Sequence, residues 1–244
     1  MSTFVIVHGG WRGGWTLTPL ARVLRSMGHE VFTPTLTGLG ERVHLAAARP
    51  NLETHILDVA NVLAYEDLHD VILCGHSYAG MVVSGVADRM PERIAALVYV
   101  DAFVPEDGEA WWDLAGDYFR KVAIDGSAAD GFSVTPTPGP DPRRVPHPLA
   151  SFRQAIRLTG RWREVAEKMY IYASGWSETP FTALYERLGR DPDWIVKSVP
   201  TGHDVYGKAQ SEFLSFVQEL KGVAPKQHDL RTSDPSSRGG IEDM

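Results

Sequence analysis

The sequence contains a single cysteine, Cys74, among its 244 residues. One cysteine forms no internal disulfide, and it cannot by itself supply a multi-cysteine metal site. A surplus of positive charge is also missing, since 24 Lys and Arg oppose 31 Asp and Glu for a net charge of −7. A basic footprint for nucleic acid or for an anionic membrane is therefore absent, and we expect neither as a partner.

Long apolar runs are absent as well. The chain enters the apolar segment Thr3-Phe4-Val5-Ile6-Val7 without a basic stretch before it, which argues against a signal peptide or a membrane span. Together with the lone Cys74, this predicts a cytoplasmic protein. No His-Glu-x-x-His pattern or carboxylate–histidine cluster is present, so we expect no metal and no cofactor. The expected partner is a small molecule, and a homodimer is left open.

What the sequence does contain is an alternation of short apolar segments with helical patterns. The apolar segments are residues 3–7, 30–35, 71–74, 94–100, 169–173 and 194–199. Helical patterns lie between or after them, as at 15–27, 51–65 and 210–221. This alternation predicts an α/β fold with six mainly parallel strands and helices on both faces of the sheet. In such sheets function gathers at the carboxyl ends of the strands.

The alternation is interrupted between residues 103 and 163. This stretch holds three of the seven tryptophans and a Pro-rich run at 134–148 that can be neither helix nor central strand. Exposed indoles are unusual, so we predict a lid inserted over the site rather than a solvated linker. The predicted division is a core of residues 1–102 and 164–221, a lid of residues 103–163 and a disordered tail of residues 222–244.

One strand-to-helix junction carries a serine. The segment 71–74 is followed by Gly75-His76-Ser77-Tyr78-Ala79-Gly80 and then by a helical stretch from 81 to 90. A serine at such a corner is held in a strained backbone conformation that pushes its Oγ out of the sheet and requires small neighbours. Gly75 meets this requirement, and Ala79 departs mildly from the Gly-x-Ser-x-Gly pattern. We predict that Ser77 is a nucleophile; the alternative is a serine in a phosphate-binding turn.

A nucleophilic serine needs two donors for the oxyanion that forms on its substrate. His8-Gly9-Gly10-Trp11 follows the first apolar segment, and glycines there allow a backbone N–H to face inward. We predict that the N–H groups of Gly10 and Tyr78 form the oxyanion hole. The alternative, a nucleotide-binding loop, fits neither the Gly-x-Gly-x-x-Gly pattern nor the P-loop pattern.

The base is sought among the nine histidines, because the unperturbed pKa of imidazole lies closest to neutral pH. His203 lies in Gly202-His203-Asp204, directly after the last apolar segment and before the final helix. A loop at a strand end can bring it to a serine on a neighbouring strand. His76 should point away from the Ser77 Oγ. We therefore predict His203 as the base, with an ordinary surface-loop histidine as the alternative.

A glycine loop, an elbow serine and a late histidine follow one another in α/β-hydrolases. The chain resembles that superfamily over about residues 3 to 221, in the motifs His8-Gly9-Gly10-Trp11-Arg12-Gly13-Gly14-Trp15, Gly75-His76-Ser77-Tyr78-Ala79-Gly80-Met81 and Gly202-His203-Asp204. It is similar to the branch of plant methyl-salicylate-type esterases, hydroxynitrile lyases and small bacterial ester and carbamate hydrolases, some of which degrade xenobiotics. The resemblance implies an α/β-hydrolase fold and an acyl-enzyme mechanism.

The resemblance leaves open the acid that orients the base. Members of this branch usually carry Asp a few residues past the strand that matches 169–173, where this chain has Trp176. Some superfamily members carry the acid one strand earlier, and Asp101, directly after segment 94–100, matches that placement. We predict Asp101 as the acid and keep Glu178 as the alternative. Further candidates are Asp193, Glu106 and Asp107.

Four tryptophans are candidates for the wall of a substrate pocket, namely Trp11, Trp111, Trp112 and Trp176. The prediction is a carboxylic-ester hydrolase with a Ser-His-Asp triad that cleaves a methyl ester or a carbamate of a small aromatic or apolar molecule. One alternative is a hydroxynitrile lyase-like enzyme, although such relatives typically carry Thr and Lys where this chain has Gly10 and Asp204. The other is a non-catalytic ligand-binding protein of the same fold.

Overall fold

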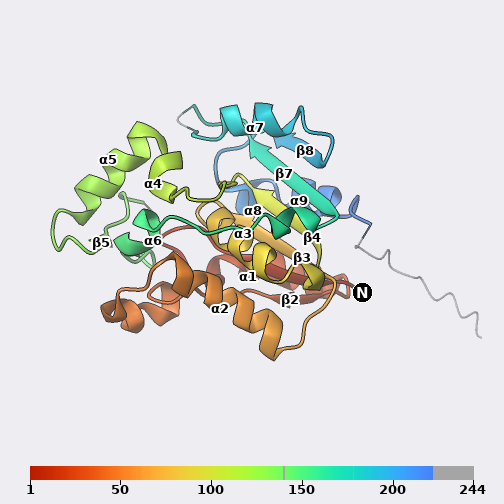
Figure 1. Ribbon diagram of the computed structural model, residues 1–244, viewed down its shortest axis with the longest axis horizontal. Helices are drawn as coiled ribbons and strands as arrows, with labels where there is room; N and C mark the ends of the chain where they lie inside the picture. Colours follow the sequence, from red (N-terminus) through yellow and green to blue (C-terminus); the bar gives the residue numbers. More distant parts are fainter. Residues whose placement is uncertain (140, 178, 222–244) are drawn as a thin grey trace, which may run out of the picture.

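The computed structural model describes residues 1–139, 141–177 and 179–221, so the predicted tail at 222–244 lies outside the described residues. The main sheet has six strands in the order β2-β1-β3-β4-β7-β8, and all neighbouring strands are parallel (Figure 1). These strands are β1 Thr3–Val7, β2 Glu30–Phe32, β3 Val71–His76, β4 Ile94–Val100, β7 Glu167–Ala173 and β8 Trp194–Val199. The predicted α/β fold with a parallel sheet is confirmed.

Strand bounds follow the apolar segments closely. β1, β4 and β8 begin and end where the sequence predicts, while β3 and β7 are each slightly longer. The longer β3 keeps pairing with β4 up to the pair His76 and Val100, one residue before Ser77. The edge strand β2 ends at Phe32, before the predicted 35, because Pro34 has no N–H to donate to the ladder.

Helices cover both faces of the sheet (Figure 1). Side chains alternate along each strand, so Val5 and Val7 belong to one apolar core and Phe4 and Ile6 to the other. The first core is closed by α2 Leu52–Tyr65, α3 Ala79–Arg89 and α7 Thr182–Leu188. The second is closed by α1 Thr18–Ser26, α8 Val205–Lys208 and α9 Gln210–Val217. Short 3₁₀ helices complete these layers: η1 Gly14–Leu17, η2 Gly40–Ala48 and η3 Pro91–Arg93.

Two helix ends follow from local sequence. Asn51 caps α2 by accepting the Thr54 N–H at 3.0 Å, and the Thr54 side chain closes a capping box. The α1 helix ends before Gly28, which has a φ of +88° and so lets the chain reverse into β2. Both ends agree with the predicted helices.

Residues 103–163 form a layer of short elements between β4 and β7. They are α4 Trp111–Leu114, α5 Gly116–Ser127, β5 Ser133–Val134, β6 His147–Pro148, α6 Leu149–Arg153 and η4 Arg161–Glu164. β5 and β6 pair antiparallel, and Figure 1 shows α4, α5 and α6 together at one end of the sheet, away from the N-terminus. The segment returns to the core at Asp88 of α3, whose carboxylate accepts the N–H groups of Thr159, Gly160 and Trp162.

Within the described residues, no helix combines the length and the apolar composition that a bilayer span requires.

The junction from β3 to α3 depends on two glycines. A Cβ on Gly75 would lie 2.8 Å from a methyl carbon of Val83, and a Cβ on Gly80 would overlap the carbonyl oxygen of Phe103. Gly80 is therefore the position where α3 and the chain after β4 approach most closely. The predicted pattern wants glycine at position 79, and Ala79 is tolerated because the close contact falls on Gly80 instead.

We predict that Gly80→Ala lowers the free energy of unfolding by at least about 2 kcal/mol, because the added methyl group forces α3 away from Phe103. Urea unfolding followed by circular dichroism measures this loss. Gly202→Ala is the matched control, since nothing lies within 4 Å of its added Cβ, and it should change stability by less than about 0.5 kcal/mol. A Gly80→Ala protein as stable as this control would contradict the prediction.

Candidate active site

Three non-glycine residues at the carboxyl ends of adjacent strands have positive φ. Trp11 follows β1 with a φ of 60°, Ser77 follows β3 with 58°, and Asp101 follows β4 with 44°. Each such residue costs on the order of 1–3 kcal/mol and persists only where its surroundings hold it. Strain of this kind concentrated at one edge of the sheet marks that edge as a functional site.

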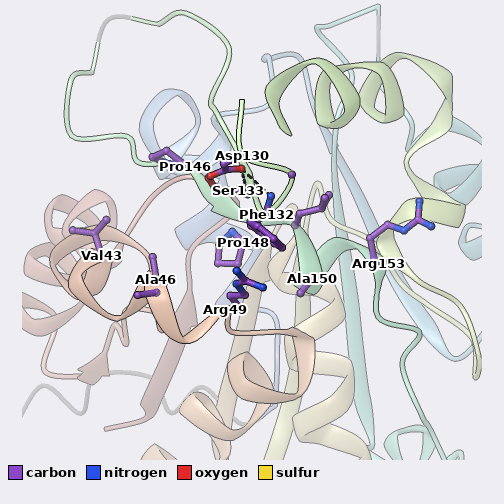
Figure 2. A pocket seen from close by; sticks show the side chains of 13 residues that line it. Val43, Ala46, Arg49, Asp130, Phe132, Ser133, Pro146, Pro148, Ala150 and Arg153 are labelled. Atoms are coloured by element: carbon purple, nitrogen blue, oxygen red, sulfur yellow. Dashed lines mark hydrogen bonds between the residues drawn. The ribbon is translucent and has the colours of Figure 1, made fainter. Parts of the chain in front are cut away.

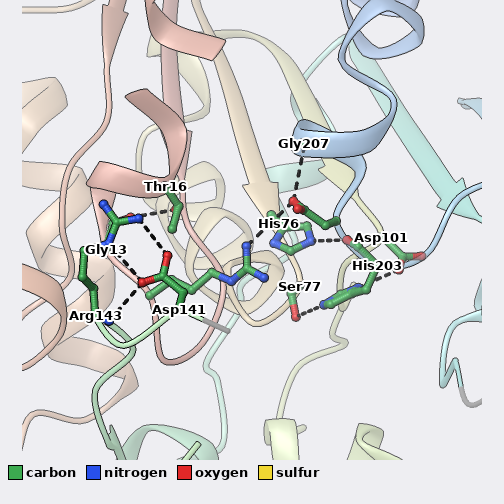
Figure 3. A network of polar contacts seen from close by, with 11 residues as sticks. Gly13, Thr16, His76, Ser77, Asp101, Asp141, Arg143, His203 and Gly207 are labelled. Atoms are coloured by element: carbon green, nitrogen blue, oxygen red, sulfur yellow. Dashed lines mark hydrogen bonds and ion pairs between the residues drawn. The ribbon is translucent and has the colours of Figure 1, made fainter. Parts of the chain in front are cut away.

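Ser77, His203 and Asp101 form one chain of hydrogen bonds (Figure 3). His203 Nε2 lies 2.8 Å from Ser77 Oγ, and His203 Nδ1 lies 2.7 Å from Asp101 Oδ2. The other carboxylate oxygen of Asp101 accepts the Ala173 N–H at 3.1 Å. The predicted nucleophile, base and first-choice acid are thus brought together by three different strand ends.

Electrostatics at the pair favour a carboxylate next to a neutral imidazole. Burial raises the pKa of Asp101 to about 7, and the Ala173 N–H that donates to its carboxylate opposes this shift. The short bond from His203 Nδ1 opposes it too, because an N–H donor stabilises the ionised form. Because the Nδ1–H of the neutral His203 ring donates to Asp101, its Nε2 is unprotonated and faces the Ser77 hydroxyl.

Loss of hydration is also the main cause that lowers the pKa of His203, although 31% of its side chain still faces the cavity. Two charged neighbours act in opposite directions. Arg12 lowers the pKa of His203 further and Asp204 raises it. The Arg12 Nη1 and Asp204 Oδ1 atoms lie 3.8 Å apart, so each charge partly screens the other.

His76 points away from Ser77, as predicted, and braces the loop of the base instead. Its Nε2 lies 2.8 Å from the carbonyl oxygen of His203, and a carbonyl only accepts, so Nε2 carries the proton. Burial lowers the pKa of His76 to about 3, with a smaller contribution from His203. His76 is therefore a neutral hydrogen-bond donor that holds the backbone of the base.

The two predicted oxyanion donors lie beside Ser77. Gly9, in the same loop as Gly10, sits so close to the elbow that an added Cβ would lie 3.1 Å from Ser77 Cβ. Both Gly10 and Tyr78 line the cavity that Ser77 opens into. Among the described residues, neither of their N–H groups has a hydrogen-bond acceptor. Two unengaged N–H groups next to a serine hydroxyl can receive an oxyanion.

The cavity in front of Ser77 has a volume of about 350 Å³ and a largely aromatic wall. The wall includes Trp11, Trp111, Phe119, Phe152, Trp176 and Phe181. Three of the four predicted tryptophans are present, but Trp112 is not among the described lining residues and lies under the Arg153 guanidinium, 4.3 Å from the ring centre. The expectation for Trp112 is not met because consecutive helical residues point about 100° apart.

Two guanidinium groups that the sequence analysis did not single out also line the cavity, those of Arg12 and Arg144. Arg144 Nη1 donates to the Thr137 carbonyl at 2.8 Å. The described lining residues contain no Asp or Glu, and the Arg12 guanidinium pairs with Asp204, which lies outside that lining. Arg12 stands inside the His8–Trp15 motif and could have been noticed there, whereas the Pro-rich run around Arg144 gives no periodic signal.

The other candidate acids are engaged elsewhere. Glu106 pairs with Arg163 at 2.6 Å, and Asp107 accepts the Leu158 N–H at 2.8 Å. Asp193 is exposed, and Glu178 lies outside the described residues. Of the candidate acids whose positions are described, Asp101 is the one hydrogen-bonded to His203.

A second and larger hollow, of about 620 Å³, lies between η2 and the β5–α6 region (Figure 2). Its labelled side chains are mostly apolar, and Arg49 lies 3.5 Å over the ring of Phe132. The Asp130 carboxylate there accepts the N–H groups of Phe132 and Ser133, both at 2.8 Å. Its described lining contains none of the predicted catalytic residues, so the smaller cavity is the candidate active site.

Comparison with known proteins identifies the family of this chain. The model of the alpha/beta hydrolase family matches residues 4–228. A carbendazim hydrolyzing esterase from Nocardioides sp. (strain SG-4G) is 40% identical over 241 residues, covering 90% of this chain and 100% of that protein. Salicylic acid-binding protein 2 from Nicotiana tabacum is 31% identical over 104 residues, which are 42% of this chain and 40% of that protein.

The solved structure of an extracellular alpha/beta-hydrolase from a Paenibacillus species matches with a TM-score of 0.75 at 22% identity, covering 90% of this chain and 99% of that chain. At this identity the likeness concerns the fold. It confirms the fold class that the motifs predict.

The opposed charges at His203 generate a prediction about its pKa. Arg12→Gln should raise the pKa of His203 and Asp204→Asn should lower it, because the first change removes a positive neighbour and the second a negative one. Asparagine keeps the cap that Asp204 provides to the Gly207 N–H. Titration of ¹⁵N-histidine-labelled protein by NMR measures both shifts. Shifts of the same sign in the two variants would refute this account of the site.

Proposed function

The chain belongs to the alpha/beta hydrolase family, and we propose that it is a serine hydrolase that cleaves ester-type bonds. The relative that matches 90% of the chain is a carbendazim hydrolyzing esterase, and polyneuridine aldehyde esterase and methylesterase 2 are among the others. The observation that carries the proposal is the hydrogen-bonded chain from Ser77 through His203 to Asp101, with Ser77 and His203 on the wall of a largely aromatic cavity.

Acylation follows from these positions. His203 Nε2 takes the hydroxyl proton of Ser77 while Oγ forms a bond to the carbonyl carbon of the substrate. The electron pair of the C=O bond moves onto oxygen, which accepts hydrogen bonds from the N–H groups of Gly10 and Tyr78. When the C=O bond re-forms, the bond to the alcohol oxygen breaks, and that oxygen takes the proton from His203.

Deacylation repeats the sequence with water. Water gives a proton to His203 Nε2 and attacks the acyl carbon, and the oxyanion again faces Gly10 and Tyr78. Collapse releases the acid and returns the proton to Ser77 Oγ. Asp101 takes no proton in this scheme; it holds His203 in the Nδ1–H tautomer and stabilises the imidazolium that forms in each half-reaction.

The cavity limits the substrate to a small molecule. A volume of about 350 Å³ with walls such as Trp111, Phe152 and Trp176 suits an aromatic or apolar group. We propose a methyl ester or a carbamate of such a molecule, which agrees with a relative that hydrolyses carbendazim and with another described as a pyrethroid hydrolase. A role in degrading xenobiotic esters is part of this proposal.

A hydroxynitrile lyase activity is the rival within the family, since an alpha-hydroxynitrile lyase from Arabidopsis thaliana is 30% identical over 104 residues. This chain has Gly10 and Asp204 where such relatives typically have Thr and Lys. Asp204 here pairs with Arg12 instead. These differences favour hydrolysis. A cytoplasmic location and a homodimer stay predictions from the sequence.

The test of the proposed function is a substrate panel assayed with Ser77→Ala beside the wild type. The wild type should cleave methyl esters and carbamates of aromatic molecules. The Ser77→Ala variant should cleave them at a rate at least about a thousandfold lower, because the acyl-enzyme cannot form. Release of alcohol measures the rate. Cleavage of a cyanohydrin, or ester cleavage that survives in Ser77→Ala, would replace the proposed function.

The acid is tested separately. Asp101→Asn should lower kcat by roughly ten-thousandfold, since an amide at this position lets His203 adopt the wrong tautomer. Glu178→Gln is the matched control and should leave kcat within about threefold. The reverse ranking of the two variants would assign the acid to Glu178.

A further inference from the structure

Trp11 follows the proposed donor Gly10 and has a φ of 60°, a conformation that bulky residues rarely adopt. All three polar groups of Trp11 are hydrogen-bonded to the antiparallel pair β5 and β6 or to a residue next to it, far away in the sequence. The Trp11 N–H donates to His147 Nδ1 at 3.3 Å, and the indole N–H donates to the Val134 carbonyl at 2.7 Å. The Trp11 carbonyl accepts the Val145 N–H at 3.1 Å. Because a strained turn needs external support, these bonds set the position of the loop.

His147, on β6, is completely buried, and its two ring nitrogens have fixed roles. Nδ1 faces an N–H, which only donates, so Nδ1 carries no proton. Nε2 then carries the proton and donates to Ser151 Oγ at 2.8 Å, and that hydroxyl donates to the Pro148 carbonyl at 2.8 Å. Burial holds the pKa of His147 well below its ordinary value, so the ring stays a neutral acceptor toward Trp11.

The His147 ring also contacts both elements that supply the proposed oxyanion donors. Its centroid lies 4.7 Å from that of Tyr78, the residue after the nucleophile. On the other side, a Cβ on Gly10 would lie 3.6 Å from His147 Nδ1. The ring stacks on Phe152 at 4.1 Å, which fixes its plane. His147 therefore packs between the Tyr78 side chain and the backbone at Gly10, and it is not among the described residues that line the cavity.

We propose that His147 is a positioning residue for the oxyanion hole, which places the Gly10 N–H by accepting the N–H of Trp11. The inference rests on the proposed serine mechanism. Negative charge on the substrate oxygen develops in the transition state and is small in the bound substrate. A displaced Gly10 N–H therefore destabilises the transition state more than it weakens substrate binding. Loss of the acceptor at position 147 lowers kcat and leaves KM nearly unchanged.

Two substitutions separate the acceptor from the packing of the ring. His147→Phe keeps a flat ring against Phe152 and Tyr78 and removes the acceptor. His147→Asn keeps an acceptor near the position of Nδ1 and gives up the ring. We expect His147→Phe to lower kcat for an aromatic methyl ester by about 10- to 100-fold with KM within about threefold, since removal of a whole oxyanion donor costs about 10²–10³ in kcat. His147→Asn should recover at least about half of that loss on a logarithmic scale.

Thermal unfolding of both variants shows whether they fold. A folded His147→Phe with the kcat of the wild type would overturn the inference. An increase of KM alone, or an equal loss of kcat in His147→Phe and His147→Asn, would also overturn it, because those results describe packing. If the wild type cleaves no ester at all, the proposed function has failed instead, which keeps the two failures distinguishable.

A measurement on the unmodified protein decides the case if His147→Phe does not fold. Spectra of ¹⁵N-histidine-labelled protein between about pH 5 and 8 should show His147 as the neutral Nε2–H tautomer throughout. An Nδ1–H tautomer, or protonation within this range, would mean that Nδ1 does not accept the Trp11 N–H, and the inference would be wrong.

Discussion

The left-handed turn at Ser77 is the constraint on which the rest of the site depends. A serine with a φ of 58° is unfavourable, and it persists here because β3 before it and α3 after it are almost completely buried. Backbone hydrogen bonds connect the turn to β4 and to the residues after it. The Ser77 N–H donates to the Val100 carbonyl, and the Phe103 N–H donates to the Ser77 carbonyl. Gly80 permits this approach. Packing energy spread over the core thus holds one hydroxyl at the edge of the sheet.

Burial shapes the charges around that hydroxyl. The site holds a buried carboxylate that two N–H donors satisfy, and guanidinium groups sit on the cavity wall. Burial lowers the pKa of several histidines at once, namely His8, His55, His76 and His147. Neutral imidazoles each offer one donor and one acceptor, so they connect backbone segments without adding charge. His203 differs because its two ring nitrogens are bonded to the side chains of Ser77 and Asp101.

Residues from the segment between β4 and β7 line the cavity and also hold the loop after β1. Trp111 and Phe152 from this segment form part of its wall, and His147 and Val134 hold the turn at Trp11. The candidate active site is therefore assembled from strand ends of the sheet and from the segment between β4 and β7. A substitution in this segment can therefore change the reaction rate by moving the backbone of the loop after β1, without touching the reacting atoms.

The sequence by itself determined the parallel sheet, the elbow at Ser77 and the late His203, because these features depend on apolar periodicity and on glycine within a few residues. Only the tertiary structure decided which carboxylate lies beside His203, since that depends on the strand order that places β4 next to β3. It also excluded Trp112 from the described cavity lining and joined Trp11 to His147. Such contacts form between segments that are far apart in the sequence. Local sequence patterns do not predict which of these segments come to lie side by side.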